Sequence, residues 1–81
     1  MTDEEILTRI HGLVDEERKI REQRGESSLS EEQERDAVRR LDVALDQCWD
    51  LLRQRRARKE AGEDPGLAEA RPASEVEGYL Q

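Results

Sequence analysis

Few side chains of this chain have types and spacing that could support catalysis or metal binding. His11 is the only histidine and Cys48 the only cysteine among the 81 residues. Asp15, one helical turn from His11, could orient the imidazole. A catalytic base also needs a nucleophile, an oxyanion donor or a pocket, and the sequence indicates none of them. Zinc sites take about four ligands, so His11 and Cys48 are too few. We therefore expect no catalytic residue, no metal and no cofactor, and predict that the protein is not an enzyme.

Cys48 lies among apolar residues, where a lone cysteine behaves as a small buried hydrophobe. One cysteine cannot form an internal disulfide, which argues against a secreted protein that is stabilised by disulfides. The start Met1-Thr2-Asp3-Glu4-Glu5 lacks the basic and apolar regions of a signal peptide. The chain also has no apolar run near the roughly 20 residues that span a membrane. These features predict a cytoplasmic protein without a membrane partner.

A cluster of five cations could bind phosphate groups in a salt-dependent manner. It consists of Arg53, Arg55, Arg56, Arg58 and Lys59. A structural explanation is stronger, because cations near a helix C-terminus favour its dipole and would lie beside the acids at positions 3–5. The formal net charge of -7 and the absence of aromatic residues among the arginines also argue against nucleic acid.

The spacing of apolar residues predicts two helices that would position these groups. Residues 3–24 carry Ile6, Ile10, Leu13 and Ile20 on one face, after a capping box of Thr2 and Glu5. Gly25 is a suitable stop.

Residues 31–61 form the second predicted helix. Its apolar seam repeats at spacings of three and four: Val38, Leu41, Leu45, Cys48 and Leu52. The cap is either Ser30 with Gln33 or Ser28 with Glu31. Ala61, Gly62 and Pro65 mark the end.

The short connection makes the two helices antiparallel neighbours. The predicted fold is therefore all-α, an antiparallel, coiled-coil-like two-helix hairpin over residues 1–61. In this register Ile10 faces Leu45, and Ile6 faces Cys48 and Trp49. Residues 62–81 are rich in glycine, proline and acidic residues. This composition predicts an extended or disordered acidic tail.

A two-helix hairpin of this size buries few apolar side chains and is marginal alone. The apolar stripe also widens at Trp49 and Leu51, beyond what one facing helix covers. We therefore predict a homodimer that forms a four-helix bundle. The predicted interface comprises Leu45, Cys48, Trp49, Leu51 and Leu52. The competing possibility is a tail that folds back, with Tyr79 and Leu80 on Trp49.

These patterns favour a protein–protein interaction module that self-associates. An unidentified protein partner would dock on the Trp49 side or on Tyr79 and Leu80. The alternative is a nucleic-acid- or ribosome-associated factor that uses the five cations.

Several runs carry a family resemblance. They are residues 2–7, residues 45–57, residues 61–65, the pair Arg71-Pro72, and the ending 76–81. Together they resemble a family of short actinobacterial proteins classed as a domain of unknown function. The resemblance covers nearly the whole chain and implies a cytosolic bacterial protein. It implies no activity, substrate or site residue.

Overall fold

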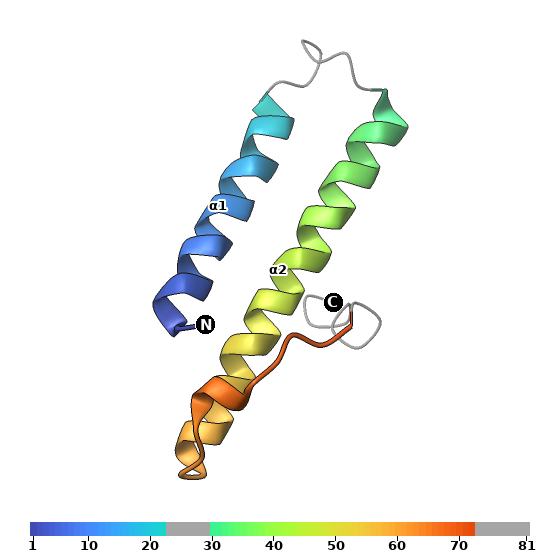
Figure 1. Cartoon of the computed structure of the whole chain (residues 1–81). Helices are drawn as coiled ribbons and strands as arrows, with labels where there is room; N and C mark the ends of the chain where they lie inside the picture. The colour runs from blue at the N-terminus through green and yellow to red at the C-terminus, as the bar shows by residue number, and fades with distance from the viewer. Residues whose placement is uncertain (23–29, 73–81) are drawn as a thin grey trace.

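The computed structural model describes residues 1–22 and 30–72, and these form two helices and one short turn. Helix α1 spans Asp3–Glu22 and helix α2 spans Glu31–Glu60. A 3-10 helix, η1, follows at Pro65–Leu67. The two long helices lie side by side and run in opposite directions (Figure 1). The described residues contain no strand. The prediction of an all-α antiparallel hairpin is confirmed.

Local side-chain bonds determine where both helices begin. The Ser30 hydroxyl accepts the Gln33 backbone N–H at 3.1 Å, and the Gln33 side-chain oxygen Oε1 accepts the Ser30 backbone N–H at 2.9 Å. This reciprocal capping box decides between the two predicted starts in favour of Ser30. At α1, the Thr2 hydroxyl accepts the Glu5 N–H at 3.2 Å. Acidic residues fill the first turn of each helix, where the helix dipole favours them.

The observed helix ends lie close to the predicted ones. Helix α2 stops at Glu60, one residue before the predicted limit, because Ala61 is its C-cap. The predicted continuation of α1 to residue 24 and its stop at Gly25 lie outside the described residues.

A backbone motif reverses the chain at the end of α2. Gly62 has a φ of 78°, in the left-handed region that favours glycine. The Gly62 N–H donates to the Lys59 carbonyl at 3.1 Å, and the Glu63 N–H donates to the Arg58 carbonyl at 2.7 Å. This pair of bonds is the Schellman motif, and it satisfies carbonyls that would otherwise lack a partner.

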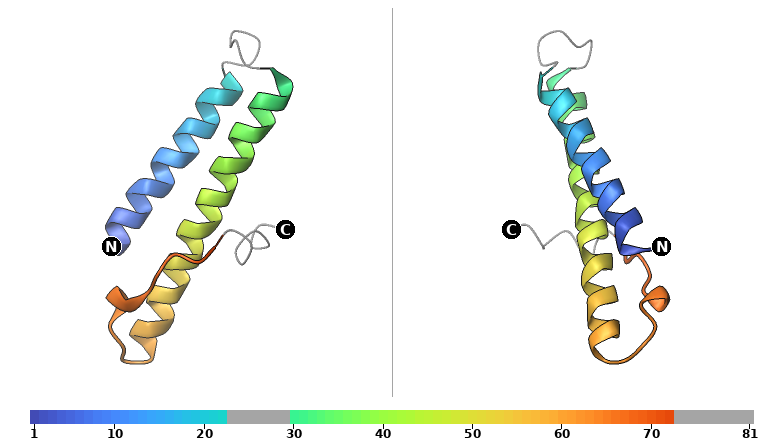
Figure 2. Two further views of the ribbon diagram at one scale, coloured as in Figure 1. Left: turned by 45° about the vertical axis from the view of Figure 1, so that its right-hand side comes forward. Right: turned by 90° about the vertical axis from the view of Figure 1, so that its left-hand side faces the viewer.

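Residues 62–72, called the return segment below, then run back along α2 (Figure 2). The Asp64 carboxylate accepts the Gly66 N–H at 2.8 Å and caps η1, which starts at Pro65. The sequence suggested an extended or disordered tail here. Within residues 62–72, turn-forming residues and contacts with α2 give the tail a defined path, and the rest of the predicted tail, 73–81, lies outside the described residues.

The buried apolar residues gather where α1, α2 and the return segment meet. Ile6 and Ile10 of α1 form the core with three residues of α2: Leu45, Cys48 and Leu51. This cluster agrees with the predicted register of the two helices, except that Trp49 is not part of it. Leu13, Leu52 and Ala68 pack against its edge. Nearer the connection, Ile20, Val38 and Leu41 are only half-buried. The core therefore occupies the half of the hairpin that the return segment also contacts.

The left-handed backbone of Gly62 generates a stability prediction. Gly62→Ala has open space for the new methyl group, so its effect comes from the backbone alone. Left-handed backbone costs an L-residue about 1–2 kcal/mol, and the free energy of unfolding should fall by that amount. Urea denaturation followed by far-UV circular dichroism measures the change. The matched control is Gly12→Ala, which adds the same methyl group in open space within α1 and should raise stability by about 0.5–1 kcal/mol. Equal effects from both substitutions would contradict the assigned role of Gly62.

Candidate functional site

Asp50 is a fully buried carboxylate in the middle of α2. Its side chain is 0 % exposed, and Arg71 of the return segment binds it. The Arg71 Nε–H donates to Oδ2 of Asp50 at 2.8 Å, while Nη2 donates to Oδ1. A bidentate arginine matches the plane of a carboxylate and is among the stronger ionic contacts in proteins. This pair connects residues that are 21 positions apart in the sequence.

Two glutamines of α2 add hydrogen bonds to the same contact. The Gln54 amide donates to Asp50 Oδ2 at 2.9 Å and to the Glu69 carbonyl at 2.7 Å. The Gln47 amide donates to the Arg71 carbonyl at 3.3 Å. Positions 47, 50 and 54 lie on one side of the helix, as their spacing requires. Leu51 shares that side and is 8 % exposed, and Ala68 of the return segment packs against the core cluster that contains Leu51.

Sequence reasoning missed the contact between Asp50 and Arg71. A usable signal was present. Asp50 lies between Trp49 and Leu51 inside the widest part of the apolar stripe. A carboxylate that is buried there needs a charged or hydrogen-bonding partner. Arg71 is the only lysine or arginine in residues 62–81, which makes it the natural candidate.

Arg55 connects three parts of the chain. Its side chain is 15 % exposed, pairs with Asp3 at the start of α1, and donates to the Pro65 carbonyl at 3.2 Å. Arg58 pairs with Glu63 at 3.6 Å. The predicted pairing between the basic end of α2 and the acidic start of α1 is confirmed at Arg55.

The other three cations of the predicted nucleic-acid contact, Arg53, Arg56 and Lys59, lie on the surface. The structure therefore divides the five cations. Arg55 and Arg58 hold parts of the chain together, and the three exposed cations form a smaller basic surface at the end of α2. A surface of this size presents fewer charges to phosphate groups than the sequence alone suggested.

Trp49 lies on the side of α2 that faces neither the core nor the contacts of Asp50. It is 41 % exposed, whereas its neighbours Cys48 and Asp50 are buried. A shallow depression beside it is lined by Asp3, Leu7, Trp49, Leu52, Arg53 and Arg56. Leu7 is exposed, and Leu52 is half-buried. We call the apolar part, Leu7, Trp49 and Leu52, the Trp49 face. Apolar surface continues along α1 at Val14, two helical turns beyond Leu7.

The predicted interface residues therefore separate into two groups. Leu45, Cys48 and Leu51 are buried in the core of a single chain, so they are not on its surface. Trp49 and Leu52 keep accessible surface. The thiol of Cys48 is likewise buried within the single chain. The predicted docking residues Tyr79 and Leu80 lie outside the described residues.

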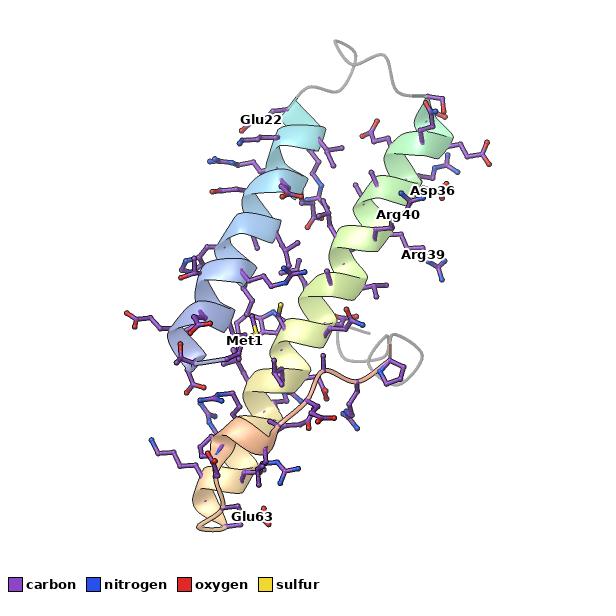
Figure 3. The ribbon with its side chains drawn as sticks, viewed as in Figure 1. Met1, Glu22, Asp36, Arg39, Arg40 and Glu63 are labelled. Atoms are coloured by element: carbon purple, nitrogen blue, oxygen red, sulfur yellow. The ribbon has the colours of Figure 1, made fainter. Side chains whose placement is uncertain are left out.

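The half of α2 nearer the connection carries charges of both signs. Asp36, Arg39 and Arg40 project from α2 on the side away from α1 in the view of Figure 3. With Val43 they line a shallow depression.

His11 is exposed on α1. In residues 1–22 and 30–72, no three histidine, cysteine, aspartate or glutamate residues are grouped so that they could hold a metal ion. No helix in these ranges is long and apolar enough to cross a membrane.

The chain belongs to a family described as a protein of unknown function (DUF2630), which residues 2–81 match. It is similar to an uncharacterized protein of Mycobacterium tuberculosis and to one of Mycobacterium bovis. Each is 51 % identical to it over 78 residues, which cover 96 % of this chain and 90 % of the relative. No solved structure matches this chain. The resemblance seen in the sequence is confirmed, and the relatives are actinobacterial proteins of nearly the same length.

The contact between Asp50 and Arg71 generates a second stability prediction. Arg71→Ala removes the partner of a buried carboxylate, and the free energy of unfolding should fall by about 1–3 kcal/mol. The return segment should also separate from α2, so the amide of Ala68, which donates to the Pro65 carbonyl, should exchange faster with deuterium. Urea denaturation and hydrogen exchange measure the two effects.

Arg40→Ala is the matched control, because Arg40 is an exposed arginine of α2 outside this contact. It should change stability by less than about 0.5 kcal/mol and leave the exchange of Ala68 unchanged. An Arg71→Ala protein with normal stability and normal protection of Ala68 would contradict the role assigned to this ion pair.

Proposed function

We propose that the protein is a non-enzymatic interaction module that self-associates through the Trp49 face. The observation that carries the proposal is the exposure of Trp49 beside Leu7 and Leu52, although α2 is covered elsewhere along this stretch. Tryptophan is enriched among the residues that contribute most to binding at protein interfaces. Exposure of 41 % leaves a large apolar surface that association would remove from water.

The charges around Trp49 support a second copy of this chain as the partner. A two-fold dimer uses the same surface patch on both copies, so the patch must complement itself. The depression beside Trp49 contains Asp3 together with Arg53 and Arg56. Asp42 lies two turns before Trp49 on α2. A patch with an apolar centre and charges of both signs can meet this requirement.

The alternative, a nucleic-acid- or ribosome-associated factor, has weaker support. Arg55 and Arg58 of its five cations have intramolecular carboxylate partners. Asp3 lines the same depression as Arg53 and Arg56, and the whole chain carries a formal net charge of -7. Acidic surroundings of this kind reduce the attraction of a phosphate backbone.

Trp49→Ala tests the proposed self-association. The natural chain should have the mass of a dimer at micromolar concentration, at both low and high salt, because the interface is mainly apolar. Loss of the indole should raise the dimer dissociation constant by about 30-fold, which is the effect of losing roughly 2 kcal/mol at a central interface residue. Light scattering after size exclusion, followed by sedimentation equilibrium, measures the mass and the constant.

Leu67→Ala provides the control. Leu67 is also an exposed apolar side chain, but it lies in η1 and outside the Trp49 face. Its substitution should leave the dimer intact. A natural chain that stays monomeric up to about millimolar concentration, where specific binding would be weaker than about 4 kcal/mol, would overturn the proposal.

A further inference from the structure

Trp49 lies between an acidic and a basic side chain at equal distances along α2. Asp42 lies seven residues before Trp49, and Arg56 lies seven residues after it. Seven residues make nearly two turns, so all three side chains project from the same side of the helix. At 1.5 Å per residue, each charge lies about 10.5 Å from Trp49 along the helix axis.

We infer that two copies of the chain pair with their α2 helices antiparallel, with the two-fold axis passing between the two Trp49 side chains. This inference rests on the proposed self-association and specifies its geometry. In this arrangement position 49 meets position 49. Asp42 of each copy then meets Arg56 of the other, so the interface gains two opposite-charge contacts beside its apolar centre.

A parallel arrangement of the same faces has the opposite electrostatic result. Asp42 would meet the second Asp42, and Arg56 would meet the second Arg56. Like charges placed opposite each other across an interface disfavour that pairing, and they commonly determine orientation and partner choice. The order of charges therefore selects the antiparallel arrangement even though the Trp49 contact is compatible with both.

The contacts of the neighbouring arginines leave Arg56 on the surface beside Trp49. Arg56 is exposed and lines the depression beside Trp49, whereas Arg55 and Arg58 are held by Asp3 and Glu63. The return segment contacts α2 through Gln47, Asp50 and Gln54, which lie on another side of the helix from Trp49. The return segment and the second copy would therefore occupy different sides of α2.

Charge exchange between the two positions tests the orientation. Asp42→Arg alone and Arg56→Glu alone each place like charges at both symmetric contacts. Each variant should weaken the dimer by about tenfold at low salt, and added salt should reduce the effect. The double variant Asp42→Arg/Arg56→Glu restores opposite charges and should dimerise like the natural chain. An equimolar mixture of the two single variants should also associate, as a heterodimer. Circular dichroism confirms that every variant keeps its helix content.

Site-specific cross-linking provides a second measurement. In a Cys48→Ala background, Asp42→Cys mixed with Arg56→Cys should form cross-linked dimers with a short thiol-reactive linker, whereas Asp42→Cys alone should not. A dimer in which Asp42→Cys links to itself, or in which the double variant stays as weak as the single variants, would overturn the antiparallel orientation and leave self-association standing. A natural chain that is monomeric throughout would overturn both proposals.

Discussion

The carboxylate of Asp50 imposes the constraint on which much of this small structure depends. A charge without access to water is costly unless other groups in the protein compensate it. Arg71, with help from Gln54, supplies that compensation, and it can do so only if the chain turns back after α2. The Schellman motif at Gly62 and the capped turn at Asp64 make this reversal possible. A polar contact thus determines the path of a segment that has little apolar surface of its own.

Helix α2 has three different surroundings as a consequence. The first side packs on Ile6 and Ile10 of α1, and the second carries the hydrogen bonds to the return segment. The third side presents Trp49 to solvent. Arg55 connects the first two sides, because its guanidinium contacts both Asp3 and the Pro65 carbonyl. The apolar core is largest where these layers meet, which explains why burial is concentrated in one half of the hairpin.

Much of the hairpin could be predicted from local patterns. The apolar spacing indicated both helices, and the placement of Ser30 and Gln33 indicated one of two possible starts. Spacing placed Ile6 and Ile10 on one face, and the short connection set that face opposite Leu45. The contact between Asp50 and Arg71 was missed because the spacing of apolar residues relates only residues within one helix. An ion pair across 21 residues depends on a chain reversal that no helical pattern encodes. For the same reason, the sequence could not show that Leu51 is covered from one side while Trp49 stays exposed.

The distance in sequence between Asp50 and Arg71 also affects how the chain is made. Ribosomes add about 5–20 residues per second, so roughly 1–4 s pass between the synthesis of the carboxylate and that of its arginine. During this time the residues of the first helix and of α2 up to Asp50 have already been synthesised, but the Asp50 carboxylate has no guanidinium to bind it. Asp50 therefore stays without this partner until Arg71 has been added to the chain. The final packing around Asp50 thus cannot precede the synthesis of Arg71.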